Sequence, residues 1–171
     1  MGRVCVSDIT DESSTFDSAK FRQVLGHVPT GVTVITGLAD GKPSGMAIGS
    51  FTSLSLDPPQ VLFCVGQNST SWPKIQAHGS FCVNVLADNQ EAISRVFASK
   101  AEDKFLEIGW KRSGNNNPMI DGALAYIDCT IHDVVESGDH FVVIGAVTDL
   151  DVTHEGSPLI FFRGGYGRFT V

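Results

Sequence analysis

Two long runs of strand-type sequence, separated by a short turn signal, constrain the fold of this chain more than any other feature. In LAYIDCTIHDVVE, apolar residues from Ala125 to Ile131 alternate with polar ones, as expected for a strand with one apolar face. The following run, HFVVIGAVTDL, is almost continuously apolar, which is typical of a strand covered on both faces. Because Gly138 and Asp139 between them favour a turn, we expect a long strand pair here.

Shorter β-type runs precede this pair, with helices inserted among them. A hairpin is expected from residues 32–35 and a return strand that begins at Ser44, followed by a strand over residues 60–66, and the three should form a small β-meander. Further strands are expected in SFCVNVLA and in PLIFFRGGYGRFTV. Apolar spacing predicts helices in FDSAKFRQVLGHV and NQEAISRVFASK, and NSTSWPKIQAHG favours a short helix that ends at Gly79.

In the first helix, Phe21, Val24, Leu25 and Val28 define one face that should be buried. Residues 101–122 lose all periodicity and are expected to form a loop. Six or seven strands without regular alternation with helices predict a mainly β fold, an antiparallel barrel that is closed or partly closed, with peripheral helices.

Composition limits the organisation and the partners of the chain. The 171 residues, 42% of them hydrophobic, suit one folded domain, which we place at residues 15–171 after a flexible, acidic tail over residues 1–14. The apolar runs fall short of the roughly 20 residues that a membrane span needs. A net charge of −7 argues against nonspecific nucleic-acid binding. We therefore expect a cytoplasmic protein without membrane or nucleic-acid partners.

The polar motifs exclude several chemistries. Cys5, Cys64, Cys82 and Cys129 lack CxxC spacing, and three of them lie in apolar β-type runs, so we expect no disulfide and no zinc site. The five histidines are scattered, and we expect no metal. G-x-S-x-G, P-loop and dinucleotide-binding patterns are also absent from the sequence.

One polar stretch leaves two interpretations open. In NSTSWP, three hydroxyl residues precede the expected short helix, and ordinary capping explains only one of them. The unpaired amides at the start of a helix can also bind a phosphate, so anion binding and plain capping both remain.

Seven segments, taken together, carry a resemblance. They resemble the flavin reductase family of the FMN-binding split-barrel fold, in particular the small NAD(P)H:flavin reductase components of two-component flavin monooxygenases. The resemblance runs from about Phe21 to the C-terminus. Its segments are FRQVLGHVPTGVTVIT, GMAIGSFTSLSLDPPQVLFCV, STSW, FCVNVLADNQ, DKF, GDHFVVIGAV and PLIFFRGGYG.

The resemblance implies an antiparallel split β-barrel and an activity. It implies hydride transfer from NADH or NADPH, with NADH the expected donor, to FMN or FAD, and supply of the reduced flavin to a separate monooxygenase component acting on an aromatic compound. It also implies a homodimer with the flavin near the subunit interface. The cofactors carry this chemistry, so no essential general acid or base is expected.

The resemblance also implies a site. Small side chains after Ser44 would let the backbone approach the flavin ring, while Leu54 and Leu56 would face the barrel interior. Lys100 would help to hold the phosphate, and His140 would orient the nicotinamide, with Tyr166 a second candidate. The implied cofactor-binding residues are Pro43, Gly45, Met46, Ala47, Gly49, Ser50, Phe51, Thr52, Cys64, Gly66, Gln67, Asn68, Ser69, Thr70, Ser71, Lys100, His140 and Tyr166.

Two alternatives share the expected barrel. One is a non-catalytic flavin or haem binder, and the other is an enzyme like pyridoxamine-phosphate oxidase that uses its flavin differently. The segments GDH and STSW favour the reductase over both.

Overall fold

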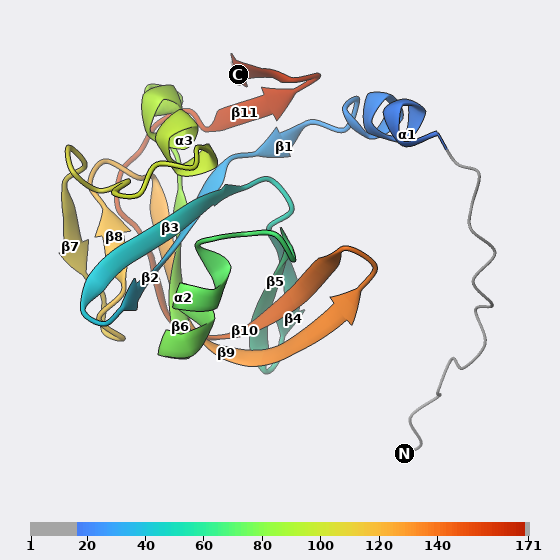
Figure 1. Cartoon of the computed structure of the whole chain (residues 1–171). Helices are drawn as coiled ribbons and strands as arrows, with labels where there is room; N and C mark the ends of the chain where they lie inside the picture. Colours follow the sequence, from blue (N-terminus) through green and yellow to red (C-terminus); the bar gives the residue numbers. More distant parts are fainter. Residues whose placement is uncertain (1–16, 170–171) are drawn as a thin grey trace.

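The computed structural model describes residues 17–169, and its main body is a seven-stranded antiparallel sheet in the order β3-β2-β6-β9-β10-β5-β4 (Figure 1). Its strands are β2 (Thr33–Ala39), β3 (Lys42–Ile48), β4 (Thr52–Leu56), β5 (Pro59–Gly66), β6 (Ser80–Val85), β9 (Ala125–Ser137) and β10 (His140–Val152).

Two small sheets and three helices complete the described part of the chain. The small sheets are formed by β1 (Thr30–Gly31), β11 (Leu159–Phe162) and β12 (Gly165–Arg168), and by β7 (Trp110–Arg112) with β8 (Pro118–Ile120). The helices are α1 (Ser18–Leu25), α2 (Trp72–His78) and α3 (Glu91–Ala98). Helix α2 packs against β2, β3 and β6, and α3 packs against β3 and β2.

Several predicted elements are present where the sequence places them. The β9–β10 pair is the longest in the sheet, and Gly138 and Asp139 form its turn. The β2–β3 hairpin turns at Asp40 and Gly41, whose φ values of 51° and 77° match the positive values that a two-residue hairpin turn favours. Helix α2 ends at Gly79, which adopts the left-handed conformation of a helix C-cap.

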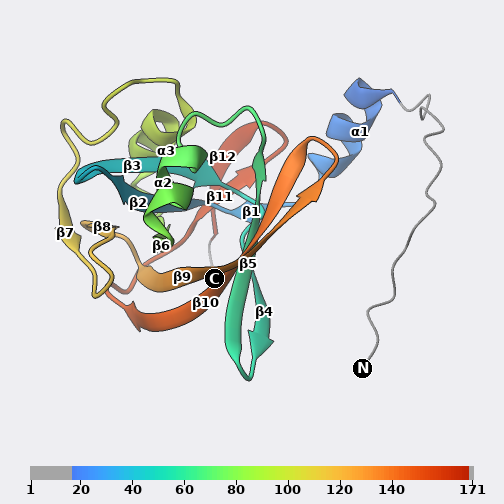
Figure 2. The ribbon, with the colours of Figure 1, turned by 60° about the horizontal axis from the view of Figure 1, so that its bottom comes forward.

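The predicted β-meander is wrong. The chain leaves the sheet between Ile48 and Thr52, so β3 and β4 are separate strands at opposite edges. Strand β5 pairs with β4 and β10 instead of β3. The prediction that Leu54 and Leu56 face the barrel is also wrong, because β4 is an edge strand on a hairpin that projects from the body (Figure 2), and Leu56 is 93% exposed.

The predicted burial of the apolar face of α1 is wrong for the single chain. Phe21, Val24, Leu25 and Val28 are each more than half exposed. Helix α1 lies apart from the main sheet (Figure 1), and its C-terminal end is held where Arg163 N donates to Gly26 O at 2.9 Å. Within one chain, the apolar stripe of this helix therefore has no sheet face to pack on.

The predicted loop over residues 101–122 contains the β7–β8 pair, which a buried amide holds in place. Asn84 is fully buried, its Nδ2 donates to Val34 O at 3.1 Å, and its Oδ1 accepts a 2.7 Å bond from Ile120 N. The Asn84 side chain thus gives the backbone amide of Ile120 in β8 a hydrogen-bond partner that no neighbouring strand supplies. The strand therefore forms although its sequence has no apolar periodicity.

Strand β2 separates two hydrophobic cores because residues 33–38 are all buried. Ile35 packs with Phe63 and Phe81 in the larger core under α2, whereas Val34 packs with Phe97 in the core under α3. The two faces of β2 therefore fix both helices relative to one strand.

The thiols of Cys64, Cys82 and Cys129 are free, and Cys5 lies outside the described residues. Burial raises the pKa of Cys129 to about 12, with a further contribution from Asp128, and the same two causes raise the pKa of Cys82. None of the helices between residues 17 and 169 is long and apolar enough to span a bilayer.

We expect Gly145→Ala to destabilise the fold by about 1–3 kcal/mol, because a Cβ at Gly145 would overlap Phe81 Cζ and lie 3.1 Å from Cys129 Cβ in a packed core. Gly167→Ala is the matched control, since no heavy atom lies within 4 Å of its added Cβ. The urea midpoint measures both, and equal midpoints for the two variants would contradict the packing of β10 on Phe81.

Candidate active site

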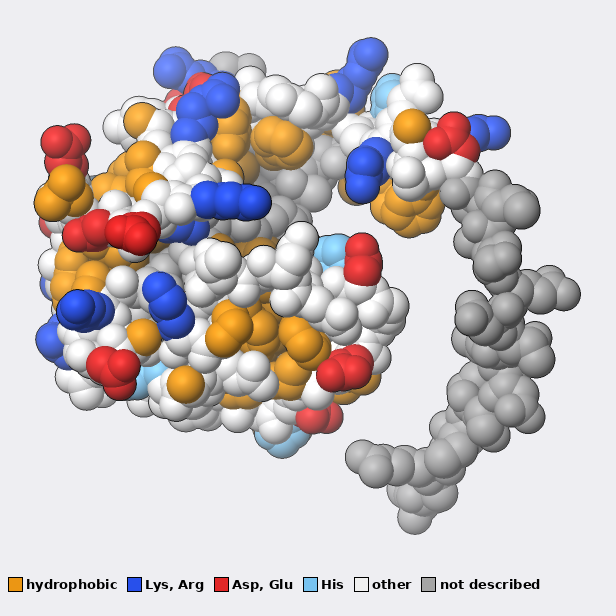
Figure 3. All heavy atoms as spheres, viewed as in Figure 1, with side chains coloured by type: hydrophobic (Ala, Val, Ile, Leu, Met, Phe, Trp, Pro, Cys, Tyr) orange, Lys and Arg blue, Asp and Glu red, His pale blue; other side chains and the backbone are white. Residues whose placement is uncertain are grey.

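Three adjoining hollows lie where β3, the end of β5, α2, α3 and the segment after α3 meet. We call them the inner pocket, of about 240 Å³, the bridging pocket, of about 200 Å³, and the outer groove, of about 740 Å³. The inner and bridging pockets share Thr70, Ser71, Lys100 and Lys104. On this face, Figure 3 shows basic and acidic side chains close together on the surface between α3 and α2.

The loop before α2 supplies hydroxyl groups to the inner pocket. Ser69 Oγ accepts a 3.2 Å bond from Trp72 N, so Ser69 is the residue that caps the helix. Thr70 and Ser71 line both pockets, and the Ser71 side chain makes no capping bond. Of the two interpretations that the sequence left open, capping accounts for Ser69 and leaves two hydroxyl residues facing the pockets.

Lys104 joins three elements at the junction of the two pockets. Its Nζ donates to Phe97 O at 2.9 Å, to Gly45 O at 3.2 Å and to Ser71 Oγ at 3.4 Å. Burial lowers the pKa of Lys104, and repulsion from Lys74 lowers it further. Since an anion placed between these lysines relieves that repulsion, the arrangement suits a phosphate.

The other end of the inner pocket is lined by small residues and backbone. Ala47 of β3 and Gly66 of β5 line it, and a Cβ on Gly66 would come within 3.0 Å of Asn68 Oδ1. Beside it, Ser50 Oγ donates to Cys64 O at 3.1 Å and accepts from Cys64 N at 2.9 Å. These bonds hold the segment between β3 and β4 against β5 and leave room for a flat ring over the backbone.

His140 begins β10 directly opposite Gly66 in the β5–β10 register. Its Nδ1 lies 2.7 Å from Asp139 Oδ1, and this hydrogen bond, followed by the charge of His140, lowers the pKa of Asp139. Gln67 N donates to Asp139 O at 3.0 Å, which ties the hairpin end to the end of β5. The imidazole is therefore oriented at the rim of the inner pocket.

The structure brings most of the predicted site residues together. The inner pocket is lined by Met46, Ala47, Gly66, Asn68, Ser69, Thr70, Ser71 and Lys100. Pro43 and Gly45 line the bridging pocket, whereas Gly49 and Tyr166 line a separate side pocket of about 180 Å³ together with Ala47. Ser50, Phe51, Thr52, Cys64, Gln67 and His140 do not line any of these hollows.

Tyr166 is not grouped with His140. Its hydroxyl lies 2.9 Å from Ser94 Oγ, and its ring lies under the Arg95 guanidinium at 4.9 Å, so its contacts are with α3. The role of each predicted residue in binding stays a prediction.

Sequence reasoning missed Lys104 and Lys74. Lys104 lies in DKF, one of the segments that carry the family resemblance, but it was not assigned to the site, and Lys74 stood out only as one polar residue of a short helix. Their convergence depends on α2 and the segment after α3 packing on the same edge of β3, which no local pattern indicates.

Fold and pockets define a split-barrel protein with a basic pocket beside small residues. The model of the flavin reductase like domain matches residues 25–170. Over 159 residues the chain is 54% identical to a flavin reductase of Pseudomonas putida, covering 92% of this chain and 94% of that protein. Over 156 residues it is 50% identical to a reductase subunit of a flavin-dependent monooxygenase of Mycobacterium tuberculosis, covering 90% and 83%.

A solved structure agrees with these relatives. The crystal structure of a nitrilotriacetate monooxygenase component B homologue from Mycobacterium thermoresistibile superposes with a TM-score of 0.87 at 49% identity, covering 89% of this chain and 86% of that chain. The chain belongs to the flavin reductase like domain family. The predicted family and the predicted split-barrel fold class are confirmed.

We expect inorganic phosphate to raise the pKa of Lys104, because an anion stabilises the ammonium form that burial and Lys74 destabilise. The Lys104 proton, which leaves at a lower pH than that of an ordinary lysine, should then leave at a higher pH. Lys74→Ala should shift the titration in the same direction without phosphate. A ¹³C-detected NMR titration of the lysine Cε signals measures both, and a pKa unmoved by phosphate would argue against an anion site.

Proposed function

We propose that this protein is the reductase component of a two-component flavin-dependent monooxygenase, which reduces a flavin with NADH and supplies it to a separate oxygenase. The convergence of Lys100, Lys104, Thr70 and Ser71 beside a wall of small residues carries the proposal. Family membership supports it, since the relatives include a reductase subunit of a flavin-dependent monooxygenase.

In this proposal, the inner pocket holds the flavin. Lys100 and Lys104, with the hydroxyls of Thr70 and Ser71, would hold the phosphate of the flavin. Ala47, Met46 and the backbone at Gly66 would lie against the ring, because small side chains leave the backbone accessible to it. The donor set and the space therefore fit a flavin mononucleotide unit.

Bound flavin would supply the redox chemistry by accepting a hydride from the nicotinamide. The chain's own residues hold and orient the two reactants and exclude water from between them. His140, fixed by Asp139 at the rim near Gly66, would orient the nicotinamide. No proton transfer by a side chain is needed for this step.

Two observations support NADH as the donor and the cytoplasm as the location. The hairpin end around His140 carries Asp139 and Glu136, whose charges would disfavour the extra 2′-phosphate of NADPH. The free thiols of Cys64, Cys82 and Cys129 agree with a reducing compartment.

We expect the purified protein to oxidise NADH when FMN or FAD is added, and to use NADPH more slowly. The loss of nicotinamide absorbance with and without added flavin measures this. A protein that binds flavin but oxidises neither nicotinamide would instead support a non-catalytic flavin carrier or an oxidase-like enzyme.

We expect His140→Ala to raise the KM for NADH about tenfold while the Kd for flavin stays unchanged, because the imidazole would contact only the nicotinamide side. His132→Ala is the matched control, as His132 is an exposed histidine farther along the same hairpin. Unchanged NADH kinetics in His140→Ala would remove His140 from the site.

We further propose that the protein is a homodimer in which a second copy covers α1. Four apolar side chains of α1 and the residues after it are exposed, and Phe161, Phe162 and Phe169 of the adjoining C-terminal segment are exposed as well. In Figure 3, hydrophobic side chains are visible on the surface of α1. Such a concentration of exposed apolar surface is typical of a protein interface.

Sedimentation velocity should therefore show a dimer for the wild-type chain, and Phe21→Glu should shift it towards monomer because a charge would be buried at the interface. Val152→Glu, at an exposed position far along β10, should leave the dimer intact. A monomeric wild-type chain would contradict the proposal.

A further inference from the structure

We infer that the side pocket is a second ligand site, which takes a small neutral phenol, and that a ligand there strengthens binding in the inner pocket. The reductase proposal leaves the side pocket unused. Phenol binding as such does not depend on that proposal, whereas the effect on flavin binding rests on it. The residues that line the side pocket lie in or next to β1, β3, α3, β11 and β12: Thr30, Val32, Ala47, Ile48, Gly49, Ser94, Phe161 and Tyr166.

The size of the side pocket suits one aromatic ring. Its volume is about 180 Å³. A protein cavity of about 150 Å³ can hold a benzene molecule, so the side pocket has room for one ring with a small substituent. The three fused rings of a flavin do not fit within this space.

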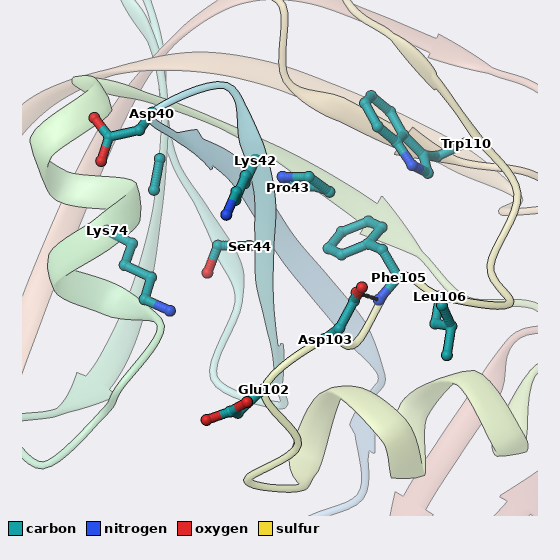
Figure 4. A pocket seen from close by; sticks show the side chains of 11 residues that line it. Asp40, Lys42, Pro43, Ser44, Lys74, Glu102, Asp103, Phe105, Leu106 and Trp110 are labelled. Atoms are coloured by element: carbon teal, nitrogen blue, oxygen red, sulfur yellow. Dashed lines mark hydrogen bonds between the residues drawn. The ribbon is translucent and has the colours of Figure 1, made fainter.

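The charge of the side pocket favours a neutral ligand. The residues that line it are all uncharged. The outer groove differs in this respect, because charged side chains of both signs line it (Figure 4): Asp40, Lys42, Lys74, Glu102 and Asp103. An ionised ligand that entered the side pocket would lose hydration without meeting an opposite charge on its walls. The pocket therefore disfavours carboxylates and phosphates.

Hydroxyl groups give the ligand hydrogen-bond partners. The Tyr166 hydroxyl and Ser94 Oγ lie 2.9 Å apart, so one donates to the other and the accepting hydroxyl still has its own proton to donate. Thr30 Oγ1 faces Gly49, since a Cβ added to Gly49 would lie 2.9 Å from it. A phenol hydroxyl both donates and accepts, so it can join the Ser94–Tyr166 pair.

The aromatic wall of the side pocket is held in place by contacts of its own. The rings of Phe161 and Tyr166 pack edge-to-face, with their centroids 5.2 Å apart. The Arg95 guanidinium lies over the Tyr166 ring at 4.9 Å and forms an ion pair with Glu91 Oε1 at 2.6 Å. A further aromatic ring gains edge-to-face or offset contacts with such a pair, and a preformed wall reduces the ordering cost of binding. The pocket therefore favours an aromatic ring over an aliphatic one.

The side pocket shares a wall with the inner pocket, because Ala47 and Ile48 line both. Thr33 Oγ1 donates to Ile48 O at 3.0 Å, which ties the end of β3 to β2. A ligand in either pocket packs against this wall and orders it, so the second ligand loses less conformational entropy on binding. The two ligands should therefore raise each other's affinity, and linkage requires that they do so by the same factor.

Fluorine NMR with 4-fluorophenol at about pH 7, where a phenol is neutral, tests the inference. The wild-type protein should bind this probe saturably, with a Kd about tenfold lower than that of fluorobenzene, which lacks the hydroxyl, or of 4-fluorobenzoate, which is charged. Cyclohexanol, which carries the same hydroxyl on an aliphatic ring, should displace the probe only weakly. Equal affinity for the three fluorinated compounds, or no saturable binding of 4-fluorophenol, would overturn the inference.

Two hydroxyl variants locate the bound probe. Tyr166→Phe and Ser94→Ala should each raise the Kd for 4-fluorophenol about five- to tenfold and change that for fluorobenzene by less than about twofold. The sequence has two tyrosines, and Tyr126→Phe is the matched control, because the Tyr126 hydroxyl donates to Asp149 Oδ2 outside the pocket. Either hydroxyl variant suffices if the other does not fold. Equal weakening by Tyr126→Phe and Tyr166→Phe would place the probe elsewhere and refute the assignment.

Flavin titrations test the shared wall. Saturating 4-fluorophenol should lower the Kd for FMN about fivefold, and FMN should lower the Kd for the probe by the same factor. A Kd for FMN that the probe leaves unchanged would contradict the coupling. A Kd for FMN that the probe raises would mean that the flavin ring itself occupies the side pocket, and the inference would then be wrong.

Two further outcomes separate this inference from the dimer and from the reductase. Binding of 4-fluorophenol by Phe21→Glu but not by the wild-type chain would mean that a second copy fills the side pocket, which rules out a ligand site there. Binding of the phenol by a wild-type protein that oxidises no NADH would support the side-pocket site and refute the reductase.

Discussion

The burial of β2 on both faces is the constraint on which the rest of the molecule depends. Ile35 points into the core under α2 and Val34 into the core under α3, so a slip of one residue would exchange two packed side chains and break the bonds of Asn84. The register of β2 in the sheet is therefore fixed. Since β3 pairs with β2 without a register shift, the position of β3 is fixed as well. The wall of the inner pocket is built on β3, and its geometry is set by β2, which does not itself line that pocket.

The second constraint on the site is electrostatic. The chain has a net charge of −7, yet Lys74, Lys100 and Lys104 converge on one edge of β3. Lys104 Nζ donates hydrogen bonds to Phe97 O of α3, to Gly45 O of β3 and to Ser71 Oγ of the loop before α2. It therefore holds these three segments together around the pocket and also supplies a positive charge. A lysine ammonium is a compact point charge that does not impose the planar geometry of an arginine. Such a cluster therefore suits either a terminal phosphate or a diphosphate.

The sequence predicts the parts of this structure that have local causes. The long strand β9, the turn at Asp40 and Gly41, and the stop at Gly79 depend on neighbouring residues, and each is found. Elements with distant causes were missed: β8 forms because Asn84 supplies its partners, and β3 and β4 separate because β5 pairs elsewhere. The predicted burial of the apolar face of α1 is not found within one chain, where its side chains are exposed.

The residues of the candidate site also divide into those that a local pattern indicates and those that only tertiary packing brings together. Ser69, Thr70 and Ser71 stand out locally, and family resemblance adds Lys100 and the small residues of β3, all of which line the pockets. Lys104, Lys74 and Trp110 come from segments whose convergence is purely tertiary. Local pattern and resemblance therefore find part of the lining of the pockets, whereas the packing of the segment after α3 brings in further basic and aromatic side chains. Lys104 is half-buried where these segments meet, so solvent screens its charge less than that of an exposed lysine.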